Sequence, residues 1–316
     1  MQAAIDSGIP VLDLNDFLNP KTTSIFVHNI GEAFEEIGFI ALKNHGVAEE
    51  LLDEFYLAIE AFFNLPLELK SKYKDNDGGQ RGYTPFGIEH AKGKPAADLK
   101  EFWHFGQWVE NDPDLEEFYP KNKVVQELPK FNELGKSIYV ALEKTATHIL
   151  RAIALHLSLE ENYFDKKIQN GNSILRPIHY PPITSEPKNS IRAGEHEDIN
   201  LITLLVGASA DGLQVLNKKE EWVPVTKVED SIIINVGDML QRLTNNKLKS
   251  TTHRVVNPPK EKWNNSRYSI PFFLHPKPAV SLACLENCVD SENPKQYSNI
   301  TAIDYLNERL KEIGLK

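Results

Sequence analysis

The sequence predicts a mainly β protein with flanking helices, built around a double-stranded β-helix, or jelly roll. Short apolar segments of strand length follow one another from residue 173 onward, and turn signals rich in Pro, Gly and Asn separate them. Patterns with helical spacing lie before this region and at the C-terminal end. Many short strands in succession favour a jelly roll, which places a site inside a small barrel.

The N-terminal region, residues 8–120, is expected to combine helices, strands and a loop that contacts the substrate. Apolar residues at helical spacing predict helices over 23–37 and 49–63. Short apolar runs predict strands over 9–14, 39–42 and 101–105. Residues 75–95 are rich in Gly, Lys and Asp and predict a long loop. Because long loops are usually functional or disordered, we expect this one to contact the substrate.

The rest of the chain is expected to form the barrel and the helices around it. The longest helical pattern spans residues 128–159 and is expected to be broken into pieces. The jelly-roll core is expected over 172–277, with strands over 174–180, 199–206, 213–216, 222–225, 231–236, 251–256 and 268–273. A helix is predicted over 301–313, within a C-terminal segment 298–316. We expect residues 1–316 to form one structural unit, because barrels of this size are often single domains.

Composition excludes several classes of partner. The chain has 35 basic and 45 acidic residues and a net charge of -10, whereas nucleic-acid binding needs a basic surface. No apolar run approaches the roughly 20 residues needed to span a membrane, and the N-terminus does not resemble a signal peptide. The two cysteines, Cys284 and Cys288, are too few for a disulfide framework. We therefore expect a cytoplasmic protein that acts on a small-molecule substrate.

Three short segments carry the residues that predict a function. They are residues 194–200 (GEHEDIN), 250–256 (STTHRVV) and 266–273 (SRYSIPFF). Together they supply two imidazoles and one carboxylate for a metal, and a cation and a hydroxyl for an organic acid. Two His and one carboxylate, with the other metal positions open, are how non-haem Fe(II) oxygenases hold iron.

The spacing within these segments has a geometric reason. Residues i and i+2 of a strand point to the same side, so His196 and Asp198 can reach one ion from a strand or its end. His253 lies among β-branched residues that favour a strand. Arg267 and Ser269 are again two apart, and a guanidinium fork beside a hydroxyl suits a carboxylate. Taken alone, each of these residues could have a structural role, because one H-x-D in a chain with 10 His is unremarkable. The order of the three segments argues against the alternative of a non-catalytic jelly-roll module.

On these motifs the chain resembles the iron- and 2-oxoglutarate-dependent dioxygenases, in the branch that contains isopenicillin N synthase and many plant oxidases. The resemblance extends to residues 9–14 (IPVLDL), 33–39 (AFEEIGF), 43–47 (KNHGV), 81–83 (RGY), 179–182 (HYPP), 234–238 (INVGD) and 243–246 (LTNN). It implies that His196, Asp198 and His253 are iron ligands. It also implies that Arg267 and Ser269 clamp a carboxylate that Tyr180 contacts.

The resemblance further implies the reaction. An enzyme of this kind binds Fe(II), uses 2-oxoglutarate and O2, and releases succinate and CO2. Its substrate loses a hydrogen atom, and the outcome is hydroxylation, desaturation or cyclisation. From the predicted loop and the strand over 101–105, we expect the substrate contacts Arg81, Tyr83, Phe102 and His104.

Three departures from the family pattern bear on the chemistry. Ile178 stands where many plant members have an Asn, which removes one polar contact to 2-oxoglutarate. Glu197, between the first two ligands, matches isopenicillin N synthase, where many plant members have Thr. The main alternative is an oxidase of the isopenicillin N synthase type, which uses no 2-oxoglutarate. The C-terminal sequence lacks the Gln that ligates iron in that synthase, which argues against this alternative.

Overall fold

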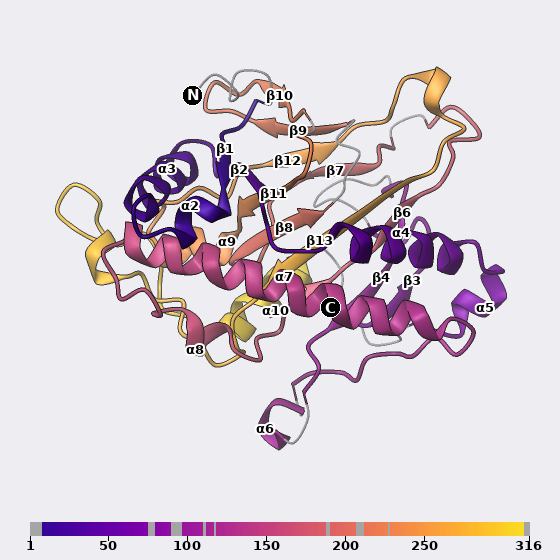
Figure 1. Ribbon diagram of the computed structural model, residues 1–316, viewed down its shortest axis with the longest axis horizontal. Coiled ribbons are helices and arrows are strands. Elements are labelled where there is room, and N and C mark those ends of the chain that lie inside the picture. The colour runs from indigo at the N-terminus through magenta and orange to yellow at the C-terminus, as the bar shows by residue number, and fades with distance from the viewer. Residues whose placement is uncertain are drawn as a thin grey trace.

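Two β-sheets face each other in the computed structural model, and helices cover the outer face of the larger sheet (Figure 1). The structure describes residues 8–74, 80–89, 97–109, 112–116, 118–187, 190–206, 212–226 and 228–312. Within them, the larger sheet has nine strands in the order β1-β2-β11-β8-β13-β5-β4-β3, and β6 pairs with β13 and β4. The smaller sheet has the order β10-β9-β12-β7. This arrangement confirms the predicted mainly β fold with flanking helices.

The strands are short, as a jelly roll requires. Those of the larger sheet are β1 (Val11–Asp13), β2 (Phe39–Lys43), β3 (Gly82–Thr84), β4 (Glu101–Gly106), β5 (Ile174–Leu175), β6 (Ile178–Tyr180), β8 (Ile202–Val206), β11 (Ser231–Val236) and β13 (Arg267–Leu274). Those of the smaller sheet are β7 (Ala193–His196), β9 (Leu213–Leu216), β10 (Trp222–Pro224) and β12 (His253–Val255).

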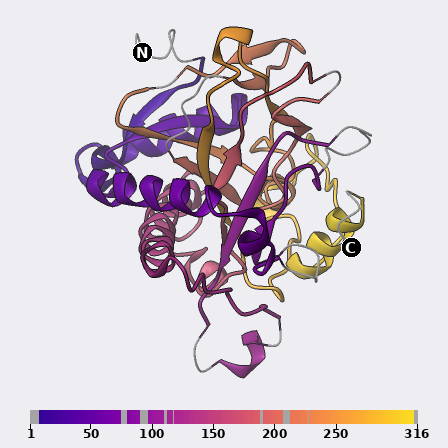
Figure 2. The ribbon, with the colours of Figure 1, turned by 90° about the vertical axis from the view of Figure 1, so that its right-hand side faces the viewer.

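The helices lie mainly on one side of this pair of sheets, and α7 runs along the larger sheet (Figures 1 and 2). They are α2 (Leu14–Leu18), α3 (Thr23–Glu36), α4 (Glu49–Phe63), α5 (Leu67–Ser71), α6 (Pro113–Glu116), α7 (Pro129–His156), α8 (Asp165–Ile168), α9 (Asp238–Leu243) and α10 (Ala302–Glu312). Two short 3-10 helices are η1 (Lys260–Lys262) and η2 (Glu286–Cys288).

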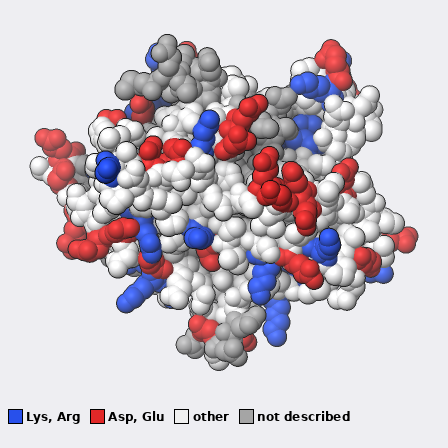
Figure 3. Space-filling model, viewed as in Figure 1, with Lys and Arg blue, Asp and Glu red and all other residues white. Residues whose placement is uncertain are grey.

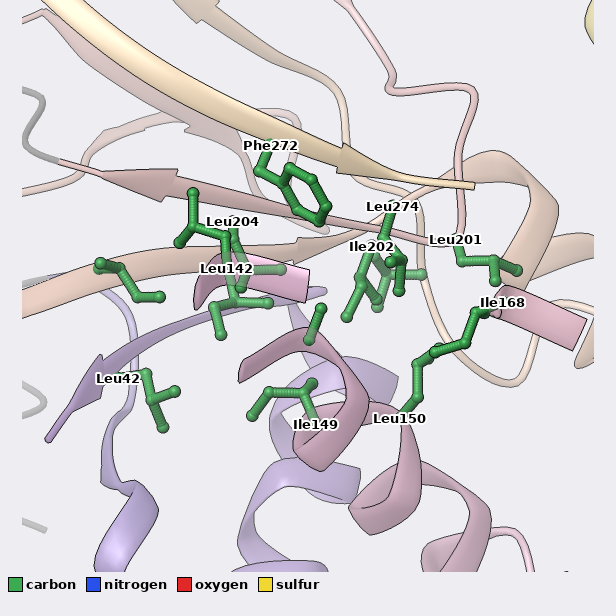
Figure 4. Close-up of a cluster of buried hydrophobic side chains, with 14 of the residues drawn as sticks. Leu42, Leu142, Ile149, Leu150, Ile168, Leu201, Ile202, Leu204, Phe272 and Leu274 are labelled. Carbon is green, nitrogen blue, oxygen red and sulfur yellow. The ribbon is translucent and has the colours of Figure 1, made fainter. Parts of the chain in front are cut away.

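The main hydrophobic core lies between α7 and the larger sheet. Leu142 and Ile149 of α7 point toward sheet residues such as Leu204 and Phe272 (Figure 4). Each side chain buried in this way contributes about 1.5–3 kcal/mol to stability. The expectation of a broken helix over 128–159 is wrong, because α7 is continuous. Its proline is at the first turn, where no helical hydrogen bond is lost.

A second apolar cluster lies between the two sheets. It joins Phe39, Ala41 and Ile233 of the larger sheet to Leu213 and Val215 of the smaller one. Strand residues therefore alternate between the helix-covered core and the space between the sheets. The inward-facing side chains of this second space surround the candidate site described below.

Some predicted strands differ from the observed ones. The strand over 174–180 is interrupted at Pro177, which has no backbone N–H for sheet pairing. Strand β3 lies inside the predicted loop over 75–95, of which residues 75–79 and 90–95 lie outside the described part of the chain. The apolar strand after the H-x-D motif begins only at Ile202, and His196 ends the preceding strand β7.

Charged side chains are interspersed on the surface. On the face drawn in Figure 3, acidic and basic residues lie among each other rather than in separate halves. None of the described helices combines the length and the apolar character that crossing a bilayer requires.

A buried charged group joins α5 to β4 and β6. Lys70 Nζ donates to both carboxylate oxygens of Glu101, at 3.1 and 2.9 Å. His179 Nδ1 lies 2.8 Å from the same carboxylate, and the Tyr83 hydroxyl also donates to it. Glu101 therefore neutralises Lys70 inside the protein, next to the strand that carries Tyr180.

Replacing Glu101 with Gln should lower the free energy of unfolding by about 3–5 kcal/mol, because the Lys70 charge would remain buried without its counter-ion. Urea unfolding of the purified protein measures this change. The matched control is Glu186→Gln, which removes the exposed ion pair with Lys260 and should change stability by less than about 1 kcal/mol. If both substitutions lowered the free energy of unfolding by the same amount, the buried Lys70–Glu101 pair would not be the more stabilising of the two.

Candidate metal centre

Three potential metal-ligand atoms meet where β7 and β12 pair. His253 lies directly opposite His196 in this pairing. Asp198 Oδ1 lies 3.9 Å from His196 Nε2 and 3.8 Å from His253 Nε2, and the three ligand atoms lie within 4.8 Å of one another. These separations are too long for hydrogen bonds. Donor atoms that converge in this way without bonding one another fit one shared ion.

A register shift in the smaller sheet helps to aim His196 at this point. The pairing of β12 with β7 runs from His253 opposite His196 to Val255 opposite Ala193, with an irregularity between them. Ala193 packs in the apolar cluster between the sheets, and His196, three residues later, also faces inward. An extra residue in one strand changes which face the following side chains occupy.

Backbone carbonyls fix the orientation of both imidazoles. His196 Nδ1 lies 2.7 Å from the Gly194 carbonyl, and His253 Nδ1 lies 3.1 Å from the Thr251 carbonyl. A proton on each Nδ1 leaves the Nε2 lone pair free for a metal. Desolvation and the charge of His253 lower the pKa of His196 to about 4. His196 is therefore neutral near pH 7, as a metal ligand must be.

The carboxylate of Asp198 is held in place by two neutral side chains. Its Oδ2 accepts hydrogen bonds from Thr203 Oγ1 at 2.5 Å and from Asn235 Nδ2 at 2.8 Å. Burial alone would raise the pKa of Asp198, but the electrostatic interactions with the His253 and His196 imidazoles and these hydrogen bonds lower it. The carboxylate is thus kept ionised, and its second oxygen, Oδ1, points toward the two imidazoles. Sequence reasoning missed Thr203 and Asn235 as supports, although Asn235 lies in the segment 234–238 that carries the resemblance.

Replacing Asn235 with Ala should weaken Fe(II) binding by about 10- to 100-fold, because groups that orient metal ligands typically have effects of this size. Competition with a chelator under anaerobic conditions measures the affinity. Asn162→Ala is the control, because Asn162 is exposed, whereas Asn235 is buried and bonds Asp198. Unchanged iron affinity in Asn235→Ala would show that the hydrogen bond to Asp198 is dispensable.

A second group of polar residues lies on the paired strands β6 and β13. Arg267 is opposite Tyr180, and its Cζ lies 4.8 Å from the centre of the Tyr180 ring. Ser269 is opposite Ile178. Arg267 and Ser269 are both buried, with 5% and 2% of their surface exposed. A guanidinium and a hydroxyl buried side by side form a suitable site for a carboxylate.

The metal-ligand group and the carboxylate site share one interior. Phe273, on the same face of β13 as Arg267 and Ser269, is the cross-strand partner of Thr203. Cross-strand partners point to the same side of a sheet, and Thr203 contacts Asp198. Both groups therefore face the space between the two sheets.

Of the four expected substrate contacts, Phe102 and His104 lie on this inner face. Phe102 packs against Ile178 and Tyr180, and the His104 ring lies 4.9 Å from the Phe102 ring. Arg176, which sequence reasoning did not single out, lies with its Cζ 4.4 Å from the Phe102 ring and 5.1 Å from the Phe273 ring. The signal was present, because Arg176 precedes Tyr180 by an even number of residues in a predicted strand.

The structure places the other two expected contacts, Arg81 and Tyr83, outside this inner face. Tyr83 is opposite Trp103 on β4, so its side chain enters the helix-covered core and bonds Glu101. The Arg81 guanidinium packs so closely against Gly106 that a Cβ there would overlap it. The pairing of β3 with β4 determines these directions, and the sequence alone does not specify that pairing.

Comparison with known proteins identifies the family. Residues 9–127 match the model described as the N-terminal part of a non-haem dioxygenase in morphine synthesis, and residues 171–276 match the 2OG-Fe(II) oxygenase superfamily. A 2-oxoglutarate-Fe(II) type oxidoreductase of Emericella nidulans is 30% identical over 96% of this chain and 89% of its own.

Solved structures give the same result. A 2OG-Fe(II) oxygenase family protein of Caulobacter crescentus is 42% identical, with a TM-score of 0.90 over 97% of this chain and 99% of its own. A Neurospora crassa protein, solved in complex with alpha-KG and thymine, is 31% identical, with a TM-score of 0.83 over 96% of each chain. The chain therefore belongs to the 2OG-Fe(II) oxygenase superfamily and is an iron- and 2-oxoglutarate-dependent dioxygenase.

Proposed function

We propose that His196, Asp198 and His253 bind Fe(II), and that Arg267 and Ser269, beside Tyr180, bind the distal carboxylate of 2-oxoglutarate. The observation that carries this proposal is the convergence of the three ligand atoms within 4.8 Å in the interior that also holds a buried guanidinium. When bound, iron and 2-oxoglutarate supply an O2-dependent oxidation that releases succinate and CO2.

The protein's own residues orient and shield this chemistry. Thr203 and Asn235 fix which oxygen of Asp198 faces the metal, and the backbone carbonyls fix the tautomer of each imidazole. Burial of Arg267 and Ser269 removes water that would compete for the carboxylate. With three protein ligands, a bound metal would keep positions open for the co-substrate and O2.

We place the primary substrate, a small molecule, against Phe102, His104, Arg176 and Phe273. The Phe102 and Phe273 rings flank the Arg176 guanidinium, and Phe273 is the cross-strand partner of Thr203, which bonds Asp198. The similar Neurospora crassa protein, which is solved in complex with thymine, supports a small-molecule substrate. Removal of one hydrogen atom from such a substrate is the common first step of hydroxylation, desaturation and cyclisation.

A reducing compartment such as the cytoplasm is also part of this proposal. Iron must stay ferrous to bind the co-substrate productively, and Cys284 and Cys288 are both free thiols. The net charge of -10 further favours a small molecule over nucleic acid as the partner.

Binding of Fe(II) and 2-oxoglutarate is tested first, and the substrate is identified in a second experiment. Protein purified under anaerobic conditions should bind one Fe(II) per chain, and the iron form should bind 2-oxoglutarate in calorimetric titration. Failure of either binding step contradicts the proposal. Substrate-stimulated succinate formation, screened with pyrimidines, amino acids and small acids, then identifies the compound that is oxidised.

A further inference from the structure

A second arginine, Arg192, lies beside the carboxylate site. It immediately precedes strand β7, and its Cζ lies 5.7 Å from the centre of the Tyr180 ring. The Cζ of Arg267 lies 4.8 Å from the same ring. Two guanidinium groups therefore share one tyrosine at the start of β13.

The charge of Arg192 is buried without a counter-ion among the described residues. Only 4% of its surface is exposed, and its Nε has no hydrogen-bond partner. Its hydrogen bond with a described residue, from Nη2 to the Asn265 carbonyl, is long at 3.5 Å. Desolvation and the positive charge of Arg267 lower the pKa of Arg192 to about 10. A buried charge of this kind costs stability, and a bound anion would neutralise it.

The surroundings indicate where such an anion would lie. Ser269 is opposite Ile178, which offers no polar atom on this face. Arg267 and Arg192 meet at the Tyr180 ring. Lys100 also lies near Tyr180, but its Nζ pairs with Glu89 and Asp98 at 2.7 and 2.9 Å. A carboxylate held by Arg267 and Ser269 would thus have Arg192 as the nearby cation that has no acidic partner among the described residues.

We propose that Arg192 is a second guanidinium of this site and binds, together with Arg267, the distal carboxylate of 2-oxoglutarate. This inference rests on the proposed function, because it takes Arg267 and Ser269 as the carboxylate clamp. Arg192 supplies the polar contact that Ile178 lacks. Its unused Nε donor and its charge are what a carboxylate requires.

Calorimetric titration of 2-oxoglutarate into the Fe(II)-loaded protein without O2 tests the proposal. Arg192→Leu and Arg192→Gln should bind 2-oxoglutarate about ten- to a hundredfold more weakly than the parent protein, as expected for loss of a charge-assisted hydrogen bond. Arg192→Lys should lie between them and the parent, because it keeps the charge but loses the fork. The control Arg151→Leu, which removes a partly exposed ion pair between α7 and Asp165 of α8, should bind normally.

Thermal unfolding of the metal-free protein gives a readout that does not depend on iron. Without ligand, Arg192→Leu should melt at the same temperature as the parent or higher, since it removes an unmatched buried charge. Succinate should raise the melting temperature of the parent more than that of Arg192→Leu. A variant that melts much earlier, yet gains as much from succinate, would show a structural role and overturn the proposal.

The outcomes separate this inference from the proposed function. If 2-oxoglutarate binds Arg267→Leu as well as the parent, the clamp itself is wrong. If Arg267→Leu binds weakly while the Arg192 variants bind normally, only the inference about Arg192 fails. The inference about Arg192 would also be overturned if the Arg192 variants bound 2-oxoglutarate normally but needed a higher concentration of the primary substrate. That result would assign Arg192 to the substrate site. Should Arg192→Leu not fold, the Gln and Lys variants decide.

Discussion

Replacing His253 with Ala should abolish tight Fe(II) binding and reduce turnover at least about a thousandfold. The substitution removes one of three protein ligands, and the remaining pair cannot hold the ion in a defined geometry. His196→Ala should have the same effect, because both Nε2 atoms lie at similar distances from Asp198 Oδ1, 3.9 and 3.8 Å. Metal analysis of anaerobically purified protein and succinate formation measure the two losses.

The control for this result is Cys284→Ser. Cys284 is a partly buried free thiol whose sulfur contacts the Arg242 carbonyl, and no role at the metal is proposed for it. This variant should retain iron and activity. Iron retention with normal turnover in His196→Ala or His253→Ala would remove these residues from the ligand set.

Features with a local cause could be predicted from the sequence. Helix α4 covers Glu49–Phe63, the predicted range, because its apolar residues repeat at helical spacing without interruption. The short strands around the site follow from β-branched runs between turns. His196, Asp198 and His253 were recognisable because their side chains have few common roles together, and their order in the chain matched a known family.

Features that depend on pairing between distant strands could not be predicted. The side of β3 that Tyr83 occupies follows from its register with Trp103, and no local pattern encodes that register. The inward turn of His196 depends on the irregular pairing of β7 with β12. Arg192 belongs to no motif, and it becomes notable only because the fold leaves its charge buried beside Arg267.

Replacing Arg267 with Leu should raise the 2-oxoglutarate concentration needed for half-maximal succinate formation by about one to two orders of magnitude. A buried, bidentate Arg–carboxylate pair contributes roughly 1.5–3 kcal/mol, and Leu leaves the carboxylate without that partner. Iron binding should persist, because Arg267 is not among the three proposed ligands. Arg267→Lys should restore the affinity only in part, since a point charge cannot form the fork.

Iron content measured in parallel separates loss of the clamp from loss of the metal. An unchanged 2-oxoglutarate dependence in Arg267→Leu would remove Arg267 from the clamp. Substrate oxidation without any 2-oxoglutarate would instead indicate an oxidase of the isopenicillin N synthase type, in which Arg267 holds a carboxylate of the substrate itself.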